Sequence, residues 1–111
     1  MIKVYVAGPY SADNILDVLK NIRTGVSAAT LLLQNGFAVY CPFVDFQFGL
    51  SDSLPMDVYK NNSLAFLDSC DVILMLPNWE HSKGAREELK VAMFKNMRVF
   101  YDVENLLEWS R

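Results

Sequence analysis

The chain has 111 residues, 52% of them hydrophobic, so it is long enough for one domain that buries a core of its own. Its formal net charge is −3 and its 10 basic residues are scattered, which argues against binding to a nucleic-acid polymer, because phosphate backbones require clustered Lys and Arg. No apolar run approaches the roughly 20 residues of a membrane-spanning helix and no signal peptide precedes the first strand, so we expect a cytoplasmic protein.

The chain begins with a predicted strand and a long helix. Ile2–Ala7 is mostly apolar and β-rich, which predicts a central strand that ends at the turn Gly8–Ser11. Asp13 or Asn14 can cap the helix that follows. One face of this helix is predicted from apolar residues that recur at three- and four-residue steps: Ile15, Leu19, Ile22, Val26, Ala29 and Leu33.

A second strand and an aromatic loop come next. Gly36 predicts the end of the long helix, and Phe37–Cys41 predicts a strand that Pro42 ends. Residues 42–54 predict a long loop with an unusual density of aromatic side chains, above all Phe43, Phe46 and Phe48. Because such side chains rarely face water together, we expect them to cover a ligand pocket or to meet a partner subunit.

The second half of the chain continues the alternation of helix and strand. The predicted elements are a helix from Pro55 to about Ser69, a strand over Asp71–Leu76, a helix over Gly84–Asn96, a strand over Arg98–Tyr101, and a short helix that Asp102 caps and that ends in Trp109. This order predicts an α/β fold. We expect residues 1–111 to form a single Rossmann-like (flavodoxin-like) domain, with a parallel sheet of four to five strands and helices on both faces. Ligand clefts are expected at the carboxyl ends of the strands, at Gly8–Ser11, Pro42–Asp45 and Pro77–Gly84.

The junction between the third strand and its helix is the most informative segment. The helix start at Ser82–Ala85 offers free N–H groups and the positive end of a helix dipole, which together favour an anion such as phosphate. Glu88 follows about one turn later. A carboxylate at that distance from a phosphate site indicates chemistry on a phosphorylated sugar.

Glu87 and Glu88 are adjacent and therefore point about 100° apart on the helix. Glu87 falls on a stripe of lysines, which predicts a solvated row of ion pairs. Glu88 aligns with Gly84 and Ala92 on a small-residue face that can approach the sheet. A half-buried carboxylate there can act as a nucleophile or base, and the alternative is an ordinary surface glutamate.

Three further side chains are candidates for chemistry or binding. Tyr5 can donate its hydroxyl to a carboxylate in the cleft, or it is a core tyrosine with a satisfied hydroxyl. His81, the single histidine, can contact phosphate or shuttle a proton, or it is simply solvated. Trp79 can stack on a base or seal an interface.

The sequence contains no motif for a metal or a cofactor. It has no Gly-x-Gly-x-x-Gly or Walker loop, and no cluster of His, Cys and Asp with the spacing of metal ligands. Cys41 and Cys70 are expected to be reduced, buried, small hydrophobic residues. We therefore expect no bound metal and no cofactor.

These segments resemble the nucleoside 2-deoxyribosyltransferase superfamily, and above all a short, phage-associated branch of it. Val4–Tyr10 is similar to the first strand and loop of that branch. Its second block is similar to Cys70–Asp71 with the apolar strand that follows, Leu76–Glu80 and Ser82–Leu89. The resemblance covers most of the chain in order.

The resemblance implies that Glu88 attacks the anomeric carbon of a deoxyribosyl group, displaces the base and forms a glycosyl-enzyme intermediate. It implies that Tyr5 orients this nucleophile. The substrate-binding residues that we expect with this pair are Gly8, Pro9, Tyr10, Ser11, Asp45, Ser63, Trp79, Ser82 and Gly84.

Two serines distinguish this chain within the resemblance. Ser82 stands where members that use free nucleosides carry aspartate, and its presence implies a 5′-monophosphate substrate with Lys83 and Arg86 nearby. Ser63 stands where the family places an acidic aspartate that protonates or positions the base. Candidates to replace that acid are Asp45, Asp57 and Asp68.

The expected function is an N-glycosidase or deoxyribosyltransferase-like enzyme that acts on a nucleoside 5′-monophosphate. Two alternatives stay open, a nucleotide-binding or sensor module without catalysis and a small interaction protein of the same fold. It also stays open which base the substrate carries, whether its sugar is ribose or deoxyribose, and whether the reaction is hydrolysis or transfer. The apolar content, with Phe43, Phe46, Phe48 and Trp109, predicts a homo-oligomer, most simply a dimer.

Overall fold

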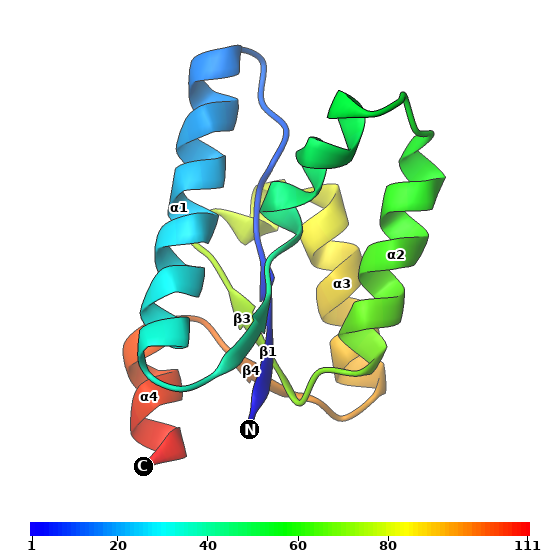
Figure 1. The fold of residues 1–111 in the computed structure, drawn as a ribbon. Coiled ribbons are helices and arrows are strands. Elements are labelled where there is room, and N and C mark those ends of the chain that lie inside the picture. Colours follow the sequence, from blue (N-terminus) through cyan, green and yellow to red (C-terminus); the bar gives the residue numbers. More distant parts are fainter.

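The sheet has four parallel strands in the order β2-β1-β3-β4, which confirms the predicted α/β architecture (Figure 1). A computed structural model describes all of residues 1–111. The strands are β1 (Lys3–Ala7), β2 (Ala38–Tyr40), β3 (Val72–Met75) and β4 (Arg98–Phe100). Because β1 pairs with both β2 and β3, it is a central strand, as its apolar sequence predicts.

Helices cover both faces of this sheet (Figure 1). They are α1 (Ile15–Gln34), α2 (Met56–Asp68), α3 (Lys83–Phe94) and α4 (Val103–Ser110), with the 3₁₀ helices η1 (Pro42–Leu50) and η2 (Trp79–His81). One core cluster joins the sheet to α1, α4 and η1, and the other joins it to α2 and α3. No helix is both long and apolar enough to cross a membrane.

Alternation along β1 decides which core each side chain enters. Val4 and Val6 belong to the cluster under α1 and α4, whereas Tyr5 and Ala7 belong to the cluster under α2 and α3. Tyr5 therefore points to the side of the sheet that carries α3, the helix of Glu88.

The helix starts follow local capping chemistry. The Asn14 side chain accepts a hydrogen bond from the Asp17 N–H at 2.9 Å, so Asn14 and not Asp13 caps α1. Asp102 caps α4 as predicted, by accepting from the Asn105 N–H at 2.8 Å. These caps set where α1 and α4 begin.

The segment predicted as a loop over residues 42–54 is a 3₁₀ helix over Pro42–Leu50, so that prediction is wrong. Phe43 inserts into the core with 2% exposure and packs against Gly25 of α1. The absence of a side chain at Gly25 gives the ring its space, and the burial anchors η1 on α1. Phe43 is thus part of the monomer core and does not belong to an interface.

The buried face of α1 also differs from the predicted face. Of the predicted residues Ala29 is buried, together with Gly25 and Leu32, whereas Ile15, Leu19 and Leu33 are exposed. The helix is apolar over more than one face, and the small residue Gly25 determines which face approaches η1. Packing against η1, which the sequence pattern did not predict, thus rotates the helix relative to the expected stripe.

Candidate functional site

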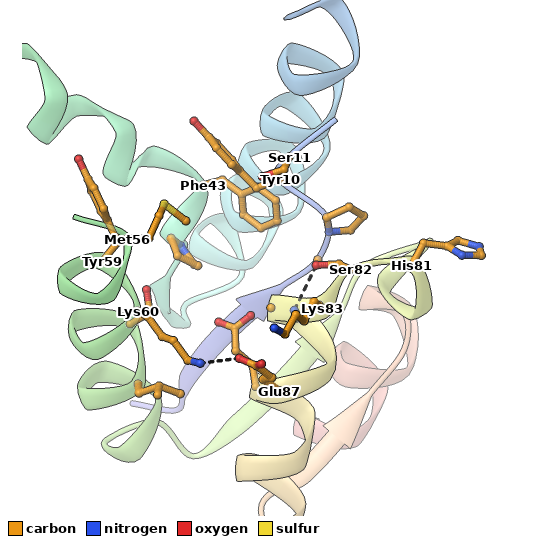
Figure 2. A pocket seen from close by; sticks show the side chains of 18 of the residues that line it. Tyr10, Ser11, Phe43, Met56, Tyr59, Lys60, His81, Ser82, Lys83 and Glu87 are labelled. Atoms are coloured by element: carbon orange, nitrogen blue, oxygen red, sulfur yellow. Dashed lines mark hydrogen bonds and ion pairs between the residues drawn. The ribbon is translucent and has the colours of Figure 1, made fainter. Parts of the chain in front are cut away.

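A cavity of about 620 Å³ opens at the carboxyl edge of the sheet, between α2 and the first turns of α3 (Figure 2). This volume lies within the range of small-molecule sites. Four segments contribute to its lining: the loop Gly8–Ser11 after β1, Pro42 and Phe43 after β2, α2 and the start of α3. The lining residues of α2 are Met56, Asp57, Tyr59, Lys60, Ser63 and Leu64, and those around the start of α3 are His81–Ala85, Glu87 and Glu88. The expected clefts after β1, β2 and β3 therefore form one cavity, as the rule for parallel sheets predicts.

Glu88 is partly buried at the base of this cavity, where it accepts a hydrogen bond from the Tyr5 hydroxyl. Tyr5 itself is fully buried in β1. Burial raises the pKa of Glu88 to about 8, while the Tyr5 hydrogen bond favours the ionised carboxylate. The interpretation of Glu88 as a plain surface glutamate is wrong, because its small-residue face does approach the sheet.

Glu87 has a different environment from its neighbour. Its carboxylate pairs with Lys60 of α2 at 2.7 Å, which closes the gap between α2 and α3 (Figure 2). The Lys60 ammonium, and more weakly Lys83 and Lys90, hold the pKa of Glu87 below its usual range. Glu87 does form an ion pair, but the predicted partners were wrong, because the ion pair joins it to Lys60 of α2 and not to Lys83 or Lys90 of its own helix.

The start of α3 presents a free hydroxyl proton to the cavity. Ser82 is the N-cap, and its Oγ accepts a hydrogen bond from the Ala85 N–H at 3.2 Å. Because that oxygen acts as the acceptor toward the backbone, its own O–H is available to donate. An anion at this position would receive that proton and the positive end of the α3 dipole.

The basic residues near Ser82 do not all face the cavity. Lys83 lines it, whereas the His81 ring points away from it although the residue forms part of the rim (Figure 2). Arg86 donates to the Glu80 carbonyl at 2.6 Å and does not line the cavity. Arg86 is therefore not positioned as the predicted phosphate neighbour.

Two predicted substrate-binding residues lie outside the cavity, and these predictions are corrected. Trp79 is half-buried against Tyr101, with ring centroids 5.9 Å apart, because η2 turns it away from the cavity. Asp45 lies on η1 and does not line the cavity, and its carboxylate accepts a hydrogen bond from the Tyr40 hydroxyl at 2.9 Å. The other predicted residues, namely Gly8, Pro9, Tyr10, Ser11, Ser63, Ser82 and Gly84, line the cavity.

Of the three carboxylates considered as replacements for the family's acid, only Asp57 lines the cavity. Asp68 instead pairs with Lys95 at the far end of α2. Asp57 is exposed on the first turn of that helix. The other carboxylates that line the cavity are Glu87, which is paired with Lys60, and Glu88 itself.

Sequence analysis missed several residues of the site. The α2 side chains Met56, Tyr59, Lys60 and Leu64 line the cavity (Figure 2). Tyr40 was also missed, although it pairs with Tyr5 in the parallel register of β1 and β2. Pairing of the two predicted strands would have indicated Tyr40, because paired positions on neighbouring parallel strands point to the same face of the sheet. No three His, Cys, Asp or Glu side chains lie together as a metal site would require.

A family model described as a domain of unknown function, DUF4406, matches residues 2–101. The matched range contains the whole sheet and every residue that lines the cavity. No curated protein matches the chain.

Proposed function

The chain belongs to the DUF4406 family of domains, and we propose that it cleaves the N-glycosidic bond of a nucleoside 5′-monophosphate with Glu88 as the nucleophile. One observation carries this proposal: the hydrogen bond from the buried Tyr5 hydroxyl to Glu88 at the base of the cavity. A carboxylate that is desolvated, oriented and open to a ligand-sized space is suited to covalent catalysis.

In the proposed reaction, a Glu88 oxygen forms a bond to C1′ of the sugar as the C1′–N bond breaks. The bonding electrons leave with the base, which takes up one proton. Water then attacks the glycosyl ester, releases the sugar phosphate and regenerates the carboxylate, or a second base attacks in its place. Tyr5 holds the attacking oxygen in position throughout.

The phosphate of the substrate is assigned to the start of α3. The free Ser82 hydroxyl proton, the α3 dipole and the Lys83 ammonium supply positive potential at that end of the cavity. Lys60 is less available, because its ammonium is already paired with Glu87. The resemblance to nucleotide-cleaving members through Ser82 supports the same placement.

A second candidate function is nucleotide binding without catalysis. Ser63 lines the cavity at the position where the resemblance implies an acidic residue, and burial holds Glu88 largely protonated at neutral pH because its pKa is about 8. Both features lower the rate of base release but leave binding intact. General-acid help is typically worth about 10²–10⁴-fold, so its loss affects rate more than affinity.

Incubation of the protein with a panel of deoxynucleoside and ribonucleoside 5′-monophosphates, with free base measured by chromatography, tests the proposal. Base release should rise with pH until Glu88 is ionised near pH 8. Glu88→Gln should abolish release, and intact-mass measurement should lose any glycosyl adduct. Glu87→Gln is the matched control, and it should keep most of the activity, since the Glu87 carboxylate, although it lines the cavity, is engaged by Lys60.

Equal loss in Glu88→Gln and Glu87→Gln at unchanged folding would contradict the assignment of the nucleophile. Nucleotide binding by the wild type with no base released at any pH would favour the second candidate.

A further inference from the structure

Tyr40 lies beside the Tyr5–Glu88 pair without lining the cavity. In the parallel register Tyr5 pairs with Tyr40 of β2 on one side and with Ile73 of β3 on the other. Paired positions share a face of the sheet, so these two side chains flank the Tyr5 ring in the same core cluster. The rings of Tyr5 and Tyr40 are stacked, with centroids 5.5 Å apart.

The two neighbours of Tyr5 differ in what supports them. Ile73 is fully buried in β3, which has a strand on each side. β2 is an edge strand, so Tyr40 has no further strand beyond it. Phe66 of α2 supports Tyr40 instead, because its ring stacks on Tyr40 with centroids 4.5 Å apart and planes inclined by 7°. The side of Tyr5 toward the sheet edge therefore depends on a helix.

Two hydrogen bonds hold the hydroxyl end of Tyr40. The hydroxyl donates to Asp45 of η1 at 2.9 Å and accepts from the Asn62 amide of α2 at 3.1 Å. Burial and the hydrogen bond with Asp45 raise the pKa of Tyr40 to about 12, so at neutral pH the phenol keeps the proton that it donates. Tyr40 is thus fixed from both η1 and α2, although none of these contacts is made inside the cavity.

The position of Tyr40 bears on the direction of the Tyr5 hydroxyl. A tyrosine hydroxyl oxygen lies on the long axis of its ring, so rotation about that axis leaves it in place and only a swing of the whole side chain moves it. The stacked Tyr40 ring obstructs such a swing toward the sheet edge. A swing would lengthen the hydrogen bond that Tyr5 donates to Glu88.

We propose that Tyr40 is a positioning residue for the Tyr5–Glu88 pair, fixed by η1 and α2 so that the Tyr5 hydroxyl stays directed at the carboxylate. The proposal deepens the proposed function and rests on it for its catalytic meaning, but its main test follows the Glu88 carboxylate and needs no turnover. It makes the reactive carboxylate sensitive to contacts that lie outside the cavity.

The ionisation of Glu88, followed by carbon NMR of its side-chain carboxyl, tests the proposal, and Glu88→Gln identifies the signal. The Tyr5 hydrogen bond favours the charged form, so Tyr5→Phe should raise the titration midpoint by about 1–2 pH units, the scale of a hydrogen bond to a charged group. Tyr40→Phe keeps the ring but loses both hydrogen bonds of the hydroxyl. It should raise the midpoint by about 0.5 pH unit, a part of the same effect.

A double variant distinguishes positioning from a general loss of packing. Tyr40→Phe added to Tyr5→Phe should leave the midpoint where Tyr5→Phe sets it, because a residue that acts through the Tyr5 hydroxyl has no effect once that hydroxyl is gone. A loss of packing would shift both backgrounds equally. Tyr101→Phe is the matched control, since Tyr101 packs on Trp79 and does not line the cavity, and it should keep the wild-type midpoint.

Two variants of Asp45 provide the test if Tyr40→Phe does not fold. Asp45→Asn and Asp45→Ala both remove the charge, but only asparagine keeps an acceptor for the Tyr40 hydroxyl. The Glu88 midpoint should therefore be higher in Asp45→Ala than in Asp45→Asn. Thermal melting checks the folding of each variant. The charged side chains that line the cavity with Glu88 are the same in all these proteins, namely Asp57, Lys60, His81, Lys83 and Glu87.

An unchanged Glu88 midpoint in folded Tyr40→Phe, or equal shifts with and without the Tyr5 hydroxyl, would overturn this inference and leave the proposed cleavage standing. Equal midpoints in folded Asp45→Ala and Asp45→Asn would do the same. The expected shifts without base release from any nucleotide would support the inference and contradict the proposed cleavage. Base release whose pH dependence moves upward with the midpoint in Tyr40→Phe would support both.

Discussion

Glu88 shows how much of a site can be predicted at the scale of single residues. Its spacing from Gly84 and Ala92 placed it on a face that could approach the sheet, and period-two alternation along β1 turns Tyr5 toward that same helix. Both signals are local and periodic, which is why sequence analysis could use them. Asp45 and Trp79 were misplaced because short 3₁₀ helices, η1 and η2, decide their directions, and such helices leave little periodic signal.

Burial of Glu88 makes folding stability depend on pH. Its folded-state pKa is about 8 against an ordinary value of 4.5, so between these limits the folded protein retains a proton that the unfolded chain has released. The contribution to stability is therefore fully present below pH 4.5 and is lost as the pH rises through 8. Glu88→Gln, which stays neutral, should raise the melting temperature more at pH 8 than at pH 5, by about 4–8 °C for each kcal/mol relieved.

Glu87→Gln serves as the control in the same melting series. Glu87 forms an exposed ion pair with Lys60, and exposed pairs contribute little to stability, so its substitution should not stabilise the protein at pH 8. Melting temperatures of wild type and Glu88→Gln that change in parallel with pH would show that Glu88 does not titrate in this way.

At the scale of elements, the contact between α1 and η1 fixes one side of the cavity. Phe43 both fills the core beside Gly25 and lines the cavity, so the position of η1 affects the shape of the site. Sequence analysis could predict that α1 is a helix, since its apolar residues recur regularly. It could not choose the buried face, because the choice depends on a glycine and on a partner element separated from it along the chain.

Gly25→Ala should destabilise the protein through this contact. A methyl group at Gly25 would lie 2.6 Å from the Phe43 ring, which is buried and cannot move aside freely. Overpacking of this kind typically costs about 1–3 kcal/mol and outweighs the gain of up to about 1 kcal/mol in helix propensity. Chemical denaturation should show a lower midpoint.

Two variants make this test specific. Gly49→Ala is the control, since a methyl group there would meet nothing within 4 Å, and it should leave the midpoint nearly unchanged. Adding Phe43→Leu to Gly25→Ala should recover part of the lost stability. A Gly25→Ala protein at least as stable as the wild type would refute the steric account of this contact.

At the scale of the whole molecule, alternation of helix and strand was sufficient to predict the parallel sheet, because short crossovers of fixed hand leave few arrangements. The aromatic residues that the sequence suggested for a single interface do not lie together on one surface. Phe43 is buried, and Trp109 of α4 packs against Phe100 with the two rings tilted and their centroids 5.3 Å apart; neither Trp109 nor Phe100 lines the cavity. Composition alone does not tell which aromatic residues a domain can cover by itself.

We predict a homodimer that uses the exposed apolar residues beside the cavity. Phe48 is 52% exposed and lies next to the cavity residue Tyr59, and Leu50 and Met56 are exposed at 87% and 78%. Light scattering coupled to size exclusion should show a dimer at micromolar concentration, and Phe48→Glu should shift it to a monomer. Trp109→Glu is the control and should leave the dimer intact.

A wild-type monomer in this measurement would rule out the predicted dimer. A dimer that survives Phe48→Glu and dissociates with Trp109→Glu would place the interface at α4 instead.

The residues of the site differ in how well they tolerate substitution, depending on whether they lie in the sheet or on α2. Tyr5 is fully buried in the central strand β1, so replacing it disturbs the centre of the sheet, whereas Tyr59 and Lys60 project from a helix whose outer surface is exposed. Mutations that alter recognition on α2 are therefore tolerated far more readily than mutations that alter the Tyr5–Glu88 pair. Selection acting on this scaffold can exchange one ligand for another through α2 while the reactive carboxylate and its hydroxyl partner stay fixed.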